Sequence, residues 1–218
     1  DGIYLIWFNA FQGCTALEEL NLPATPDLKV HNYAFQGCTS LETVTLPSSI
    51  TTIGDYAFSG CTALTEIFYN AINCRDLDIG NSLFRNGGSE AGGITLTIGK
   101  SVERIPQHLF YSAPNLVTVT FEDNTNLTEI GYGAFYYCET LTRVNITDVT
   151  AWCKLNFIHQ TANPMYYAGE VYLNGEPLTH LVIPADIPYV FPYAFAGCTT
   201  LTSIRIPSNV GFVNNYAF

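Results

Sequence analysis

The sequence has few basic side chains and no long apolar run. Only eight of its 218 residues are Lys or Arg, against 19 Asp or Glu, so the formal net charge is −11. Nucleic acids and anionic membrane surfaces reward clustered positive charge, so we expect neither as a partner. No apolar run reaches the roughly 18 residues of a membrane helix, so we expect no membrane insertion by this region. Solubility alone explains the acidity.

Patterns that carry catalysis or bind metals are also missing. The histidines are scattered, and Cys153 with His159 is too sparse a pair for a zinc site. The sequence contains no Gly-x-Ser-x-Gly elbow and no phosphate-binding loop. We therefore expect no enzyme activity, no cofactor and no metal.

A repeated phrase dominates the sequence instead. Ala-Phe-x-Gly-Cys-Thr-x-Leu-x-x-Leu-x-Leu-Pro spans residues 10–23, and closely related forms return at 34–47 and 194–207. An interval of about 24 residues is typical of a solenoid, in which each unit stacks only on its neighbours. The chain begins inside one repeat and stops inside another, at Tyr216-Ala217-Phe218. We therefore expect residues 1–218 to form one solenoid and to be a fragment of a longer protein.

Each repeat phenylalanine is preceded, five residues earlier, by a β-branched residue. The eight pairs are Ile6 with Phe11, Val30 with Phe35, Ile53 with Phe58, Ile79 with Phe84, Ile105 with Phe110, Ile130 with Phe135, Val190 with Phe195 and Val213 with Phe218. A stacked core needs such residues at a fixed offset. The pattern predicts that all eight β-branched side chains face the core.

A short alternating run after each phenylalanine predicts a strand. The runs are 17–22, 41–46, 64–69, 94–98, 116–121, 141–146, 178–183 and 201–206. Proline follows four of them, and it ends a strand because it has no N–H to donate. The fold class we predict is mainly β with short irregular or helical turns, in a right-handed leucine-rich-repeat solenoid of about eight coils with an inserted β-hairpin segment.

Alternation also predicts which strand side chains face outward. Most of them are threonines, which strand propensity explains without any function. The exceptions are Phe68, which we expect to be exposed, and a predicted cluster of Arg143, His180 and Arg205 toward the C-terminal end.

The segment 147–177 lacks the repeated phrase and is predicted to be an insert. Its many apolar residues indicate that most of it packs onto the solenoid. Near its end, Asn174-Gly175 lies between strand-like flanks and predicts a β-hairpin. Trp152, Tyr166 and Tyr167 are its candidate exposed aromatic residues.

Five of the seven cysteines occupy one repeat position, three residues after the phenylalanine. They are Cys14, Cys38, Cys61, Cys138 and Cys198. Equivalent residues of stacked coils lie about 4.8 Å apart with parallel side chains, whereas a disulfide needs converging Cβ atoms about 3.8 Å apart. The spacing favours a ladder of buried thiols over a disulfide framework. It leaves open whether Cys74 and Cys153 pair.

The phrases Ile-x-x-Ile-x-x-x-Ala-Phe and Gly-Cys-x-x-Leu-x-x-Leu-x-Leu-Pro resemble the BspA-like leucine-rich repeats of bacterial surface proteins. The likeness covers essentially the whole chain, and the stretch 151–175 is similar to an insert seen within that family. The resemblance implies a secreted or surface-exposed solenoid used in adhesion to host matrix proteins or neighbouring cells. Because the family motif is structural, it names no binding residues.

Our leading hypothesis is therefore a non-enzymatic, cell-surface or secreted binding module for a protein or glycan, which uses its sheet face or the insert. The candidate contact residues are Phe68, Arg143, His180, Arg205, Trp152, Tyr166 and Tyr167, because aromatic and Arg side chains dominate interface energetics. A structural spacer that displays another domain is the alternative, and it predicts a Thr-rich face without a patch. A glycan hydrolase, the third hypothesis, would need two carboxyl groups about 5–10 Å apart in a cleft.

Overall fold

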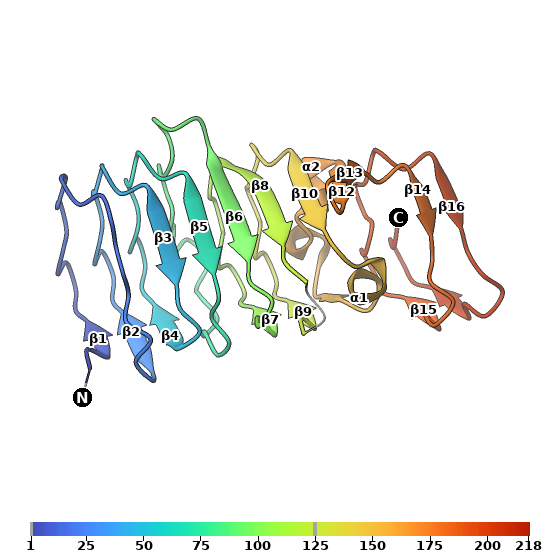
Figure 1. Ribbon diagram of the computed structural model, residues 1–218, viewed down its shortest axis with the longest axis horizontal. Helices are drawn as coiled ribbons and strands as arrows, with labels where there is room; N and C mark the ends of the chain where they lie inside the picture. Colours follow the sequence, from blue (N-terminus) through green and yellow to red (C-terminus); the bar gives the residue numbers. More distant parts are fainter. Residues whose placement is uncertain (1, 124–125) are drawn as a thin grey trace.

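Successive coils of the chain stack along one long axis (Figure 1). The structure is a computed structural model that describes residues 2–123 and 126–218. A full coil consists of a longer strand, a turn, a short strand and a second turn that carries the repeat phenylalanine. The longer strands lie side by side, and the short strands line another side of the body (Figure 1).

Seven strands form one continuous sheet, which we call the main sheet. In spatial order they are β13 (Glu176–Pro177), β12 (Glu170–Leu173), β10 (Arg143–Ile146), β8 (Leu116–Phe121), β6 (Ile94–Ile98), β5 (Glu66–Tyr69) and β3 (Thr43–Leu46). Neighbours pair in parallel, except that β12 and β13 are antiparallel. The predicted hairpin at Asn174-Gly175 is confirmed: both residues have positive φ and join β12 to β13.

The remaining strands form four small parallel sheets. They are β1 (Leu5–Ile6), β2 (Leu28–Val30) and β4 (Ile50–Ile53); β7 (Arg104–Ile105), β9 (Glu129–Ile130) and β11 (Asn156–Phe157); β14 (His180–Val182) with β16 (Ser203–Arg205); and β15 (Tyr189–Val190) with β17 (Phe212–Val213). The helical segments are α1 (Val149–Cys153), a 3-10 turn at Gln160–Ala162 and α2 (Met165–Ala168). Within the described ranges, no helix has the length and hydropathy that a membrane crossing requires.

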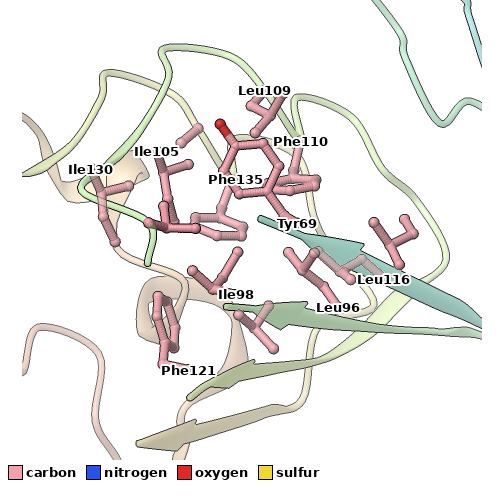
Figure 2. Close-up of a cluster of buried hydrophobic side chains, with 14 of the residues drawn as sticks. Tyr69, Leu96, Ile98, Ile105, Leu109, Phe110, Leu116, Phe121, Ile130 and Phe135 are labelled. Atoms are coloured by element: carbon pink, nitrogen blue, oxygen red, sulfur yellow. The ribbon is translucent and has the colours of Figure 1, made fainter. Parts of the chain in front are cut away.

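The repeat phenylalanines stack along the axis as predicted. Rings of successive coils from Phe11 to Phe135 lie nearly parallel, with centroids 5.1 to 6.0 Å apart. Figure 2 shows Phe110 and Phe135 beside Ile105 and Ile130, with Leu96 and Ile98 of β6 facing them. Alternate residues of each longer strand face this core, as the burial of Val119 and Phe121 in β8 illustrates.

Two of the eight β-branched residues are not buried in the core. Ile79 is 66% exposed, and Leu77, two residues earlier, is buried in its place. No strand forms in this stretch, which lies between the sheet that ends at β4 and the sheet that begins at β7. Val213, on the terminal strand β17, is also exposed. The prediction for these two residues is wrong.

The seven cysteines are all free thiols, and those of the central coils are buried as predicted. The Sγ atoms of Cys38, Cys61 and Cys138 each donate a hydrogen bond, at 3.2 to 3.5 Å, to the carbonyl of the repeat phenylalanine in the preceding coil. Burial raises the pKa of the Cys61 and Cys138 thiols to about 12. The ladder is incomplete, because Cys14 in the first coil is exposed and Cys198 is half-buried.

The segment 147–177 forms a coil of its own, so the solenoid has about nine turns. Its strand β11 extends the sheet of β7 and β9, with Phe157 opposite Ile130. Its strand β12 extends the main sheet, with Val171 opposite Val144. The segment therefore continues the stack in both sheets. At the other end, the first predicted strand, 17–22, is not formed, and its leucines are only half-buried.

Candidate functional site

Trp152, which we expected to be an exposed contact residue, is part of the core. Its side chain is 3% exposed and packs edge-on against Phe121, with ring centroids 5.0 Å apart. Its Nε1–H donates a 2.6 Å hydrogen bond to the carbonyl of Ala194. In most coils the equivalent carbonyl accepts a hydrogen bond from the backbone N–H of the repeat phenylalanine in the coil before it. The insert has no repeat phenylalanine to make this bond. Trp152 therefore joins two coils and offers no binding surface.

The outward side chains of the main sheet form rows across the strands. One row runs in register through Thr45, Phe68, Thr97, Thr120, Asn145 and Tyr172. Phe68 has a threonine on either side and faces outward as predicted, but its side chain is half-buried where we expected it to be exposed. Most of the row is polar, which leaves Phe68 and Tyr172 as isolated aromatic positions on this face.

Arg143 stacks on the last aromatic residue of that row. Its guanidinium carbon lies 3.7 Å from the centroid of the Tyr172 ring. Its Nε donates a 2.8 Å hydrogen bond to Oδ1 of Asn145, which in turn donates to Thr120. These contacts hold the guanidinium group in one orientation, and within the described residues no carboxylate lies within 4 Å of it.

His180 and Arg205 lie in a different sheet from Arg143. They belong to β14 and β16, where His180 is opposite Ser203 and Arg205 is opposite Val182. The hairpin of β12 and β13 ends the main sheet before β14 (Figure 1), because the antiparallel β13 interrupts the parallel stacking. The expected cluster of three basic residues is therefore divided between two sheets. Both His180 and Arg205 are exposed.

A group of neighbouring surface tyrosines lies elsewhere, on the turns that precede β8, β10 and β12. We define the tyrosine cluster as Tyr111, Tyr136, Tyr137, Tyr166 and Tyr167. Ring centroids of Tyr136 and Tyr137 are 4.0 Å apart and nearly parallel, and Tyr111 meets both rings edge-on at 5.8 to 6.0 Å. Tyr166 and Tyr167, from α2 of the insert, meet edge-on at 5.0 Å.

A hydrogen bond from a backbone N–H to a side-chain hydroxyl joins the two halves of the tyrosine cluster. The N–H of Tyr137 donates to the hydroxyl oxygen of Tyr167 at 3.0 Å. Hydrogen bonding with Tyr137 raises the pKa of Tyr136 to about 12, and burial raises the pKa of Tyr167. The hydroxyls of Tyr136 and Tyr167 are thus protonated and uncharged at neutral pH.

Tyr137 is an unusual residue type for its position in the repeat. The equivalent residue is glycine in four other coils, with φ between 72° and 84° at Gly13, Gly37, Gly60 and Gly197. Tyr137 adopts φ 61° at this position. A residue with a side chain is strained there by about 1–2 kcal/mol. Since Tyr137 is also 44% exposed, burial of its ring does not account for this strain.

Aromatic contacts continue from the tyrosine cluster toward later coils. Successive ring contacts link Tyr111, His108, Tyr132, His159, Tyr193 and Tyr216, with centroids 5.1 to 6.1 Å apart. Sequence reasoning predicted Tyr166 and Tyr167 as candidates but missed the others. The missed residues occupy variable positions of the repeat or replace its glycine. The substitution of Tyr137 for that glycine was the available signal.

The comparisons with known proteins agree with the repeat pattern. The family model "BspA type Leucine rich repeat region" matches this chain in six copies, over residues 1–90, 78–161 and 166–218. No curated protein matches the sequence.

Several solved structures of bacterial leucine-rich-repeat proteins are similar to this chain at low identity. A leucine-rich cell surface protein from Faecalibacterium prausnitzii A2-165 is 22% identical, with a TM-score of 0.34, and the match covers 95% of this chain and 58% of that one. A leucine-rich-repeat protein from Bacteroides ovatus ATCC 8483 is 17% identical, with a TM-score of 0.37, and the match covers 98% of this chain and 67% of that one. A leucine-rich-repeat protein from T. pallidum is 26% identical, with a TM-score of 0.40, and the match covers 88% of this chain and 71% of that one.

This chain therefore spans 58% of the length of the first of these proteins. The family assignment does not depend on them, because the family model alone matches almost every residue of the chain. The protein belongs to the family of BspA-type leucine-rich-repeat proteins.

Proposed function

We propose that this chain is a non-enzymatic binding module, displayed on a bacterial cell surface or secreted, that adheres to a protein or glycan partner. The observation that carries the proposal is Tyr137. It takes the strained backbone of a repeat glycine and leaves its ring exposed against Tyr136. Strain that packing does not require is typical of functional sites.

The chemistry of the tyrosine cluster suits recognition. Tyrosine offers a large, rigid contact area with a hydrogen-bonding tip and loses little conformational entropy on binding. The residues of the cluster come from the turns of adjacent coils and from the insert, so their relative positions are held by the stacked core. Of the residues predicted from the sequence, Tyr166 and Tyr167 belong to this surface, while Phe68 and Arg143 remain candidates for contacts on the sheet face.

The proposal is tested by screening the chain for binding to immobilised host matrix proteins and to an array of mucin glycans. For any partner found, Tyr137→Gly is the decisive variant, because it removes the ring and restores the residue that the backbone favours. We expect its partner affinity to fall at least tenfold, while its midpoint of thermal unfolding is unchanged or higher.

Ser112→Gly is the matched control, because Ser112 holds the same repeat position in the neighbouring coil, with φ 52° and no ring. We expect this variant to bind normally. A partner that binds Tyr137→Gly as tightly as the original chain contradicts the role of the cluster. A folded chain that binds nothing in the screen favours the alternative function, a structural spacer that displays another domain.

A further inference from the structure

A second surface feature lies at the opposite ends of the main-sheet strands from the tyrosine cluster. Beyond the row that contains Phe68, the next outward positions on β5, β6 and β8 are Asn70, Gly99 and Glu122. Their backbone N–H groups donate at 2.9 to 3.0 Å to Leu46, Tyr69 and Ile98, so they continue the parallel ladder. The row is thus interrupted between Asn70 and Glu122, where Gly99 has no side chain.

Asn70 and Glu122, on either side of this gap, line an open hollow of about 410 Å³. It is lined by Thr45, Pro47, Ser48, Asn70, Lys100, Ser101 and Glu122. The volume is within the range of small-molecule sites, about 300–1,000 Å³. A β-carbon at Gly99 would overlap Oδ1 of Asn70. Because φ of Gly99 is not positive, glycine is needed here for space and not for its backbone conformation.

The polar groups around the hollow are mixed donors and acceptors. Among the described residues, the side chains of Asn70, Lys100 and Glu122 make no hydrogen bond or ion pair with one another or with other side chains. Lys100 donates, Glu122 accepts and Asn70 does both, and three hydroxyl residues complete the lining. The charges of Lys100 and Glu122 cancel, so the hollow has no net charge.

We infer that this hollow binds one neutral hexose unit of a glycan. A hexose presents several hydroxyls, each both donor and acceptor, together with an apolar C–H face. The amide of Asn70, the ammonium group of Lys100 and the carboxylate of Glu122 match the hydroxyls. Phe68, two residues before Asn70 on the same face of β5, supplies an aromatic ring beside the hollow for the apolar face.

Other ligands fit this chemistry less well. A divalent cation needs several oxygen ligands, and the hollow has one carboxylate beside an ammonium group. An anionic group would meet Glu122 in a chain of net charge −11. A peptide would need a pocket for an apolar or aromatic anchor, and the lining has only Pro47 among its otherwise polar residues.

The test uses glucose, galactose, mannose and N-acetylglucosamine as probes, in saturation-transfer NMR titrations of the whole chain. A single sugar makes few contacts, so we expect saturable binding of at least one probe with a Kd on the order of 1 mM. Asn70→Ala removes the central amide, and Phe68→Thr installs the residue found at this position in the neighbouring strands. Each is expected to weaken binding at least tenfold without changing the circular dichroism spectrum.

Asn21→Ala, at an exposed position of the first coil, is the control and is expected to bind sugar normally. Tyr137→Gly is also expected to keep sugar binding, so this inference and the proposed function can fail separately. The inference is overturned if no probe binds, or if both Asn70→Ala and Phe68→Thr bind sugar as before. It is equally overturned if Asn70→Ala binds the sugar probes normally but no longer binds a matrix protein found in the screen, because the hollow is then a protein contact.

Discussion

The indole Nε1 of Trp152 lies 2.6 Å from the carbonyl oxygen of Ala194, and this hydrogen bond joins the insert coil to the coil that follows it. Asn163 supports the same junction, since its Nδ2 donates to the carbonyl of Tyr193 at 2.5 Å. Trp152 thus replaces the backbone N–H that the repeat phenylalanine donates to the equivalent carbonyl in most other coils, and Asn163 adds a second contact between the two coils. The repeated phrase can be absent from one coil without a break in the stack.

Trp152→Phe tests this junction because it keeps an aromatic ring and removes the N–H. The carbonyl of Ala194 would retain only the 3.4 Å contact from Asn163. An unsatisfied buried acceptor costs about 1–3 kcal/mol. We expect the free energy of unfolding to fall by this amount, as measured by chemical denaturation. Trp7→Phe, at an exposed tryptophan, is the control, and equal stability of the two variants would show that the hydrogen bond is dispensable.

The contrast between Ile79 and Ile105 gives a second test. Both precede a repeat phenylalanine by five residues, yet Ile79 is 66% exposed and Ile105 is fully buried. Replacing a buried isoleucine by alanine costs about 2–5 kcal/mol, whereas exposed substitutions stay within about 0.5 kcal/mol. We expect Ile105→Ala to fall in the first range and Ile79→Ala in the second. Equal losses of unfolding free energy in the two variants would support the prediction from the sequence that Ile79 faces the core as Ile105 does.

These two isoleucines also show how far the sequence determines the fold. The fixed offset identified the stacked core because most coils share the same pattern around the repeat phenylalanine. It failed at Ile79, where local chain geometry places Leu77 inward, and a count of residues cannot detect such a shift. The segment 147–177 was predicted to be an insert because it lacks the repeated phrase. In the structure, Phe157 and Val171 nevertheless continue the two sheets, which the absence of the phrase could not indicate.

The candidate site was predictable only in part, for a different reason. Residue type suggested Tyr166 and Tyr167, but exposure depends on contacts between coils that the sequence does not list. Trp152 is buried because Phe121 and Ala194 surround it. The tyrosine cluster forms because α2 of the insert lies beside the turn that contains Tyr137. The repeat pattern predicts neither of these contacts between coils.

The buried thiol of Cys138 predicts a loss of stability in alkaline solution. Its pKa is raised by burial from 9.0 to about 12. Above pH 9 the unfolded chain releases this proton and the folded chain keeps it, so the stabilisation present below pH 9 is lost as the pH rises toward 12. We expect Cys138→Ala to reduce the slope of unfolding free energy against pH by about 1.4 kcal/mol per unit in this window.

Cys14→Ala serves as the matched control for this measurement, because Cys14 occupies the same repeat position but is exposed. Denaturant titrations at pH 8, 9, 10 and 11 give the slope of unfolding free energy against pH for each variant. If Cys138→Ala and the original chain lose stability equally between pH 9 and 11, the thiol is not protected from ionisation in the fold.

The stacking of Arg143 on Tyr172 predicts a measurable coupling between the two side chains. Their contact at 3.7 Å is half-exposed, and cation–π pairs at such sites contribute about 0.5–1 kcal/mol. A double-mutant cycle with Arg143→Met and Tyr172→Leu isolates this energy, because each variant keeps an apolar body of similar size. We expect a coupling of that size in the free energy of unfolding.

The same pair should depend on the planar shape of the guanidinium group. Lysine keeps the charge but cannot stack flat on the ring or donate from Nε to Asn145 as Arg143 does. Arg143→Lys is therefore expected to lose most of the coupling with Tyr172. A lysine variant that retains the full coupling would mean that charge alone, and not stacking, connects the two residues, and the guanidinium group would then not be held in place for a ligand on the sheet face.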